Sequence, residues 1–171
     1  DPDTQIFFPE RKWGTVSIDE LRVRIGLEGL LNGHVLQKVE YTDRYLDNQD
    51  LYSADLFVEL FKGPWLNPKT RMRVSTAETK DEFERRTDAR RLRIQQALDT
   101  MPLDQPPELV WQPYGMTPHG KRLKHERELS IHLDDGDAFQ ILFDKGLDFV
   151  RPDQGACRVH EDSYVVINRS R

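Results

Sequence analysis

The chain has 171 residues, enough to form one domain with a sizeable buried core, and a formal net charge of -5. Charged residues make up 32% of it and hydrophobic residues 37%, which indicates either a small core with long polar excursions or a subunit whose extensions are ordered by neighbours. No apolar run is long enough to span a membrane, and the single cysteine excludes an internal disulfide and a cysteine metal cluster.

The N-terminal region combines an irregular segment with an ambiguous one. Residues 1–16 contain two prolines and no regular period, which predicts an extended N-terminal arm. Ser17 and Glu20 then have the spacing of a capping box, which would open a helix. From residue 21 to residue 27, however, apolar and polar residues alternate strictly, the period of a half-buried strand. We therefore predict a strand over residues 20–28.

The middle of the chain, residues 17–101, is predicted to be an α+β region. Alternating positions indicate strands, apolar stripes at helical spacing indicate helices, and Thr79 with Glu82 gives a second capping box. The elements expected after the first strand are a strand over 35–41, a short helix over 51–62, a strand over 70–75 and a long helix over about 77–100.

The last third of the chain is predicted to be mostly antiparallel sheet. Several prolines make residues 102–118 a stiff, extended connector. In the C-terminal β region, residues 119–171, strict alternation on both sides of an Asp-Gly turn predicts a hairpin over 128–143, followed by short strands. The fold class is therefore α+β: an antiparallel β-meander with hairpins, one short helix, one long arginine-rich helix and extended arms.

The long helix carries a dense group of arginines: Arg85, Arg86, Arg90, Arg91 and Arg93. Acidic residues stand three or four positions from three of them, a spacing that pairs opposite charges on a helix surface and leaves Arg90 and Arg93 freer. Such a helix is either a solvated surface laced with weak ion pairs or a docking surface for an acidic protein or a nucleic-acid backbone.

A second basic run, residues 119–127, leads into the hairpin, with Trp111 and Tyr114 before it as side chains able to stack on bases. The acidic total charge and the absence of an RNA-binding signature count against direct nucleic-acid binding. The residues predicted to bind a partner or a phosphate are Arg85, Arg86, Arg90, Arg93, Lys121, Arg122, Lys124 and Arg127.

The sequence contains no pattern that identifies a metal, a cofactor or a catalytic group. The five histidines lack ligand spacing, and the aspartate-rich segments 43–50 and 134–137 lack the full calcium-loop pattern. Neither a nucleophile elbow, a phosphate loop nor a dinucleotide fingerprint is present. We expect no catalytic residues, no metal and no cofactor.

Two short segments resemble a known enzyme family. Phe8-Pro-Glu-Arg-Lys12, followed by Asp43-Arg-Tyr-Leu-Asp47, is similar to the start of the CYTH-type triphosphate-tunnel enzymes, in which a Glu-x-Glu-x-Lys strand precedes an Asp-x-Tyr-x-Asp segment. Phe8 stands where the family has its first metal-binding glutamate. The resemblance implies metal-dependent hydrolysis of triphosphates inside a closed barrel of strands, carried by Glu10, Lys12, Arg71 and Arg73.

The function that these observations favour is non-catalytic. We predict an interaction or scaffolding subunit of a larger protein or ribonucleoprotein assembly, docked through its arms and its arginine-rich helix. The alternatives are a CYTH-like metal-dependent triphosphate hydrolase and direct binding of RNA or DNA. The lone cysteine favours an intracellular, reducing compartment. The alternative that we keep open is an organelle, which the protein would enter with a targeting peptide that is then removed.

Overall fold

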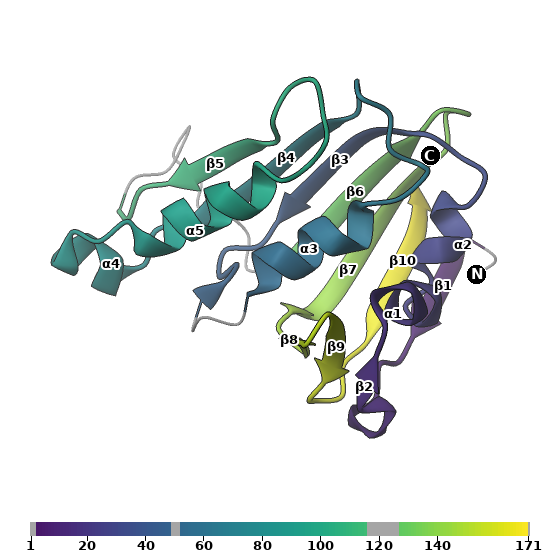
Figure 1. Ribbon diagram of the computed structural model, residues 1–171, viewed down its shortest axis with the longest axis horizontal. Coiled ribbons are helices and arrows are strands. Elements are labelled where there is room, and N and C mark those ends of the chain that lie inside the picture. The colour runs from purple at the N-terminus through teal and green to yellow at the C-terminus, as the bar shows by residue number, and fades with distance from the viewer. Residues whose placement is uncertain (1–2, 49–51, 116–126, 171) are drawn as a thin grey trace.

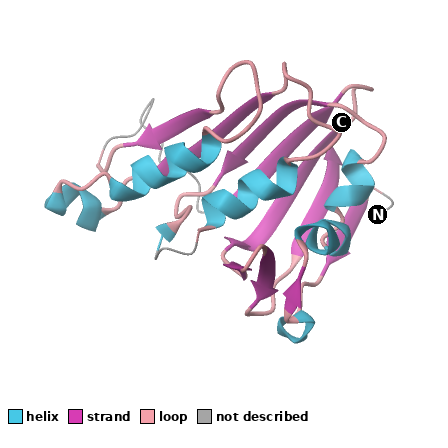
Figure 2. Ribbon diagram, in the orientation of Figure 1, coloured by secondary structure: helices cyan, strands magenta, loops and turns pink. Residues whose placement is uncertain are grey.

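The structure is a computed structural model that describes residues 3–48, 52–115 and 127–170. A seven-stranded sheet runs through the molecule, with helices on one of its faces and a small three-stranded sheet beside those helices (Figures 1 and 2). This combination confirms the predicted α+β class. Within the described ranges, no helix is both long and apolar enough to cross a membrane.

The large sheet has the strand order β1-β10-β7-β6-β3-β4-β5. The pairs β3·β4 and β4·β5 are parallel, and the other pairs are antiparallel. Its strands are β1 (Thr4–Phe7), β3 (Leu36–Thr42), β4 (Arg71–Ala77), β5 (Glu108–Gln112), β6 (Arg127–Leu133), β7 (Ala138–Leu147) and β10 (Val165–Ser170). The small sheet contains β2 (Thr15–Val16), β9 (Ala156–Val159) and β8 (Val150–Asp153).

The two parallel connections determine where the longer helices lie. They step in the same direction across the sheet, so right-handed crossovers place their helices on the same face, as Figure 1 shows. The helices are α1 (Ile18–Arg24), α2 (Leu27–Leu31), α3 (Ser53–Phe61), α4 (Lys80–Arg85) and α5 (Ala89–Leu98), and a 3-10 turn, η1 (Arg11–Trp13), precedes them.

The core lies between the helices and the sheet. The ring of Tyr41 stacks on Phe57, with centroids 5.3 Å apart, and Phe57 contacts Phe61 on the same helix at 5.1 Å. The predicted hairpin is confirmed as β6 and β7, joined at the Asp-Gly turn. The side chains assigned to its core face are all buried: Leu129, Ile131, Leu133, Phe139, Ile141 and Phe143.

The strand predicted over residues 20–28 is wrong, because this segment forms α1 and α2. The Ser17 hydroxyl accepts the Glu20 N–H at 3.0 Å, so Ser17 caps the start of a helix, while the Glu20 side chain pairs with Arg24. Gly26 separates the two helices with φ at +81°, and the Phe7 ring occupies the space that a Cβ would need. The alternating pattern predicted a strand wrongly because the helix break at Gly26 lets Leu21 of α1, Ile25 at the end of α1 and Leu27 of α2 all reach the core.

The prediction of a single long helix over residues 77–100 is also wrong, because this segment forms two helices, α4 and α5. The predicted capping box at Thr79 and Glu82 is present in full. Arg86 then adopts a left-handed conformation, with φ at +53°, and ends α4 after two turns. This bend directs α5 back over the sheet and changes the partners of the arginines.

The segments predicted as extended arm and connector both contribute strands to the large sheet. Part of the arm forms β1, which pairs with β10 at one edge, and part of the connector forms β5, which pairs with β4 at the other. One continuous sheet therefore contains strands from residues 1–16, 17–101, 102–118 and 119–171.

The face of the sheet opposite the helices is not covered by any helix or strand in the described part of the chain (Figures 1 and 2). Cross-strand pairing aligns its side chains in rows. A polar row crosses all seven strands: Thr4, Asn168, Gln140, Ser130, Glu40, Arg73 and Glu108.

The two faces should respond differently to the same substitution. We expect Ile131→Asp to unfold the domain, because it places a charge in the fully buried layer. His132→Asp, on the exposed face opposite Lys38, should change the free energy of unfolding by less than about 1 kcal/mol. Urea denaturation followed by circular dichroism measures both, and equal losses would contradict an uncovered outer face.

Candidate functional site

A buried polar cluster lies at the end of β3, next to the start of β6. Asp43 is fully buried; its Oδ2 accepts a hydrogen bond from the Tyr41 hydroxyl at 2.9 Å and its Oδ1 accepts one from the Tyr45 backbone N–H at 3.0 Å. Arg127 Nε lies 3.5 Å from the same Oδ1. Burial raises the pKa of Asp43, and the positive charge of Arg127 opposes this shift.

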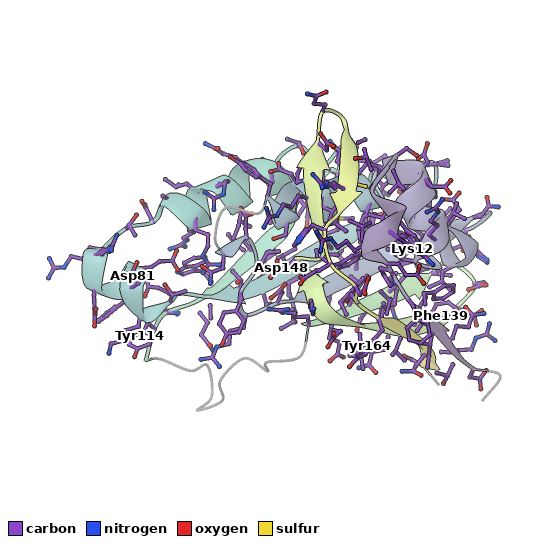
Figure 3. The ribbon with its side chains drawn as sticks, turned by 90° about the horizontal axis from the view of Figure 1, so that it is seen from below. Lys12, Asp81, Tyr114, Phe139, Asp148 and Tyr164 are labelled. Atoms are coloured by element: carbon purple, nitrogen blue, oxygen red, sulfur yellow. The ribbon has the colours of Figure 1, made fainter. Side chains whose placement is uncertain are left out.

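A second carboxylate shares the same arginine. Arg127 Nη2 lies 3.7 Å from Oδ2 of Asp148, which follows β7 and lies towards the middle of the molecule in Figure 3. Burial, and after it the charge of Asp43, raise the pKa of Asp148 to about 6. The other carboxylate oxygen of Asp148 is buried and has no hydrogen-bond partner among the residues the structure describes.

Glycine at position 146 allows this cluster to form. A Cβ there would lie 2.7 Å from both Asp43 Oδ2 and Arg127 Cδ, and φ at this residue is +58°. Two carboxylates around one guanidinium leave an excess of one negative charge, which a proton on Asp148 removes below about pH 6. The chemistry that this arrangement can support is the binding and release of one proton.

The sequence prediction missed both carboxylates. Asp43 was assigned to a polar loop over residues 43–50, yet Asp43, Leu46 and Asp47 are fully buried. A signal was present: Val39, Tyr41 and Asp43 alternate, so the strand period carries Asp43 onto the buried face. For Asp148 the only local cue is the nearby Gly146.

Arg90 forms the centre of a second buried polar group. Its guanidinium donates to the carbonyl oxygens of Leu46 at 2.6 Å and Ala77 at 2.5 Å, and to the carboxylate of Glu82 at 3.0 Å. It also lies 4.6 Å from the ring centroid of Trp111. The prediction that Arg90 is one of the freer arginines is therefore corrected: it is 6% exposed, and Glu82 binds it rather than Arg86.

Arg93 has an internal partner as well. Its Nε lies 2.6 Å from Oδ2 of Asp47, whose Oδ1 accepts the Ser53 backbone N–H at 3.0 Å. The side chain of Asp47 is completely buried, so this pair joins α5 to the start of α3. The two arginines that spacing left freer thus hold helices in place.

The remaining predicted arginines are distributed differently. Arg85 pairs with Asp81 at 3.0 Å, as its spacing predicted, and both side chains are well exposed. Arg86 is also exposed. The structure brings this end of α4 next to the segment after β5, where the Phe83 and Tyr114 rings lie 5.5 Å apart, and Figure 3 shows Asp81 and Tyr114 at the same end of the molecule.

The second basic run is described only at its end. Arg127 lies within the carboxylate cluster, whereas Lys121, Arg122 and Lys124 lie outside the described residues. Like Arg90 and Arg93, Arg127 therefore has partners inside the domain.

One group of potential metal ligands comes together at the hairpin turn. Nδ1 of His34 lies 3.4 Å from Asp134 Oδ1 and 3.5 Å from Asp135 Oδ2. The two aspartates are exposed, and Asp135 also accepts the Asp137 N–H at 2.8 Å. Turn hydrogen bonds and ion pairing account for these contacts.

The triphosphate-tunnel arrangement is not what the chain forms. Arg71 and Arg73 lie on β4 in a sheet whose edges, β1 and β5, do not pair with each other. Glu10 and Lys12 pair with each other at 3.0 Å around η1, largely exposed. The strands that the structure describes therefore form an open sheet and not a closed barrel around a charged interior, so the expectation drawn from the resemblance is corrected.

Comparison with known protein families places the chain. A family model described as the C-terminal domain of the DEAD/DEAH box helicase YjiV matches residues 8–164. The chain belongs to this family. The match covers both carboxylates of the polar cluster, Arg90 and all the strands except the two outermost in sequence, β1 and β10.

Comparisons with individual proteins give weaker similarities. The curated proteins contain no match to the chain. Among solved structures, the chain is similar to two structures of yeast tyrosyl-DNA phosphodiesterase, one of them a mutant, at 10% identity with TM-scores of 0.43 and 0.40. These similarities cover 96% and 95% of this chain, which spans 31% of the length of either phosphodiesterase chain.

The carboxylate cluster should make stability depend on pH. Because folding raises the pKa of Asp148 to about 6, the folded state holds a proton more tightly and loses stability as pH rises from about 4 to 6. The loss should reach about 3 kcal/mol, and Asp148→Asn should remove most of it. Urea denaturation between pH 4 and pH 8 measures this, and identical pH profiles for the two proteins would contradict it.

The buried arginine should matter far more than its exposed neighbour. We expect Arg90→Ala to lower the free energy of unfolding by about 3–5 kcal/mol, because Glu82 and two carbonyl oxygens would stay buried without their donor. Arg91→Ala, on the exposed side of the same helix, should cost less than about 1 kcal/mol. Chemical denaturation measures the free energy of unfolding of both variants. Similar losses would mean that the buried contacts of Arg90 do not stabilise the domain.

Proposed function

We propose that the chain is a non-catalytic accessory domain of a helicase-related protein and that it docks on the remainder of that protein. The family match supports the helicase connection, since the family is described as the C-terminal domain of a DEAD/DEAH box helicase. The observation that carries the docking part of the proposal is an apolar row on the uncovered face of the sheet.

The apolar row lies at the β1 side of this face. Ile6, Val166 and Leu142 are direct cross-strand neighbours on β1, β10 and β7, and Ile6 is 53% exposed. Phe8 and Tyr164 lie at the end where β1 stops and β10 begins, and both are exposed. Apolar side chains gathered on one exposed area are typical of a protein–protein contact.

The buried charged side chains have partners inside the domain, which supports a non-catalytic role. Asp43 and Asp148 share Arg127, and Arg90 and Arg93 bind groups inside the domain. Burial raises the pKa of the Cys157 thiol to about 11, and this buried thiol donates to the Val16 carbonyl oxygen at 3.3 Å, so it is not a thiolate nucleophile.

Binding between the domain and the helicase portion of its own protein tests the docking proposal. Ile6→Asp should weaken the association at least tenfold, because it places a charge in the apolar row. Gln5→Asp adds the same charge on the other face of the same strand and should leave the association unchanged. Isothermal titration calorimetry measures both affinities, with thermal melting as the folding control.

Two results would overturn this proposal. Equal affinities for the Ile6 and Gln5 variants would mean that the apolar row is not the contact. Phosphate release from nucleoside triphosphates by the isolated domain with magnesium or manganese, above the rate in buffer, would contradict the non-catalytic role.

A further inference from the structure

A small charged pocket lies on the uncovered face of the sheet, at the opposite side from the apolar row. Its volume is about 250 Å³, and residues of β3, β4 and the start of β5 line it together with the segment before β5. The charged side chains are Lys38, Glu40, Arg71, Arg73 and Glu108.

The ion pairs inside this pocket leave one positive charge unbalanced. Glu40 is shared between Lys38 Nζ at 2.5 Å and Arg73 Nη1 at 3.8 Å, and Glu108 accepts from Arg73 Nε at 3.1 Å. Three cations face two carboxylates, so the difference is one positive charge. The Arg71 side chain forms no hydrogen bond or ion pair within the described ranges.

Glu40 balances only part of the positive charge on this row of side chains. Lys38 stands directly opposite Arg71 on β4 and directly opposite His132 on β6, so basic side chains from three neighbouring strands form one row. Like charges directly opposite each other destabilise a sheet. An anion held between Arg71 and Lys38 would remove this repulsion and use the donors of Arg71.

We propose that this pocket binds a phosphodiester group of a single nucleic-acid strand lying across the uncovered face. A phosphodiester carries one negative charge, which matches the excess. The pocket is smaller than the roughly 300–1,000 Å³ that whole small-molecule ligands need, so it fits one phosphate of a longer molecule better than a complete nucleotide. The polar row extends from the pocket across the other strands and offers hydroxyl and amide groups to sugars and bases.

The inference does not rest on the docking proposal. The pocket lies on β3, β4 and β5, whereas the apolar row lies on β1, β10 and β7. Changes at Arg71 should therefore leave the protein association unchanged, and changes at Ile6 should leave the nucleic-acid affinity unchanged, so that failure of one proposal can be told from failure of the other.

Fluorescence anisotropy of a labelled oligothymidine with the whole chain, over a range of salt concentrations, tests the site. Arg71→Ala should weaken binding about tenfold at low salt and lower the slope of log affinity against log salt by about one, the effect of losing a phosphate contact. Arg151→Ala removes the same charge from an exposed position on β8 and should change neither quantity.

The competitors identify the source of the phosphate. Unlabelled oligothymidine should displace the probe, whereas inorganic phosphate and ATP at the same phosphate concentration should not. Equal losses for the Arg71 and Arg151 variants would overturn the site, because they would indicate diffuse electrostatic attraction. Displacement by inorganic phosphate or ATP as strong as that by oligothymidine would overturn the assignment to a nucleic-acid strand.

Discussion

One buried guanidinium holds a large part of the helix layer on the sheet. Arg90 reaches from α5 to the carbonyl oxygens of Leu46 and Ala77 and to Glu82 on α4, and its guanidinium lies over the ring of Trp111 on β5. A buried arginine is tolerated only when its donors are satisfied, so each of these groups must be in place together. One side chain therefore links the positions of three parts of the fold: α4, the loop after β3 and the edge strand β5.

The parts of the fold that were predictable from sequence are those in which one period covers a whole element. The hairpin of β6 and β7 alternates on both sides of its turn, and its inward side chains are buried as alternation requires. The helix now called α3 has an uninterrupted apolar stripe and lies within two residues of its predicted bounds at each end. In both elements local preference and burial favour the same structure.

The parts that failed depend on groups that are distant in sequence. Glu82 binds Arg90, eight positions on, because the left-handed turn at Arg86 folds α5 back, and helical spacing rules consider only positions three or four apart. The carboxylate cluster brings together Asp43 and Asp148, which are separated by more than half of the chain. The apolar row and the charged pocket require strand order and register, which no local pattern contains.

The prolines around β5 have a consequence for self-association. An outer strand with unpaired backbone groups is a template on which a second chain can add. Pro107 directly precedes β5 and Pro113 directly follows it, and neither has an N–H to donate. A strand added from another molecule could therefore extend the backbone ladder only over the short stretch between them, which protects this edge from growth into an intermolecular sheet.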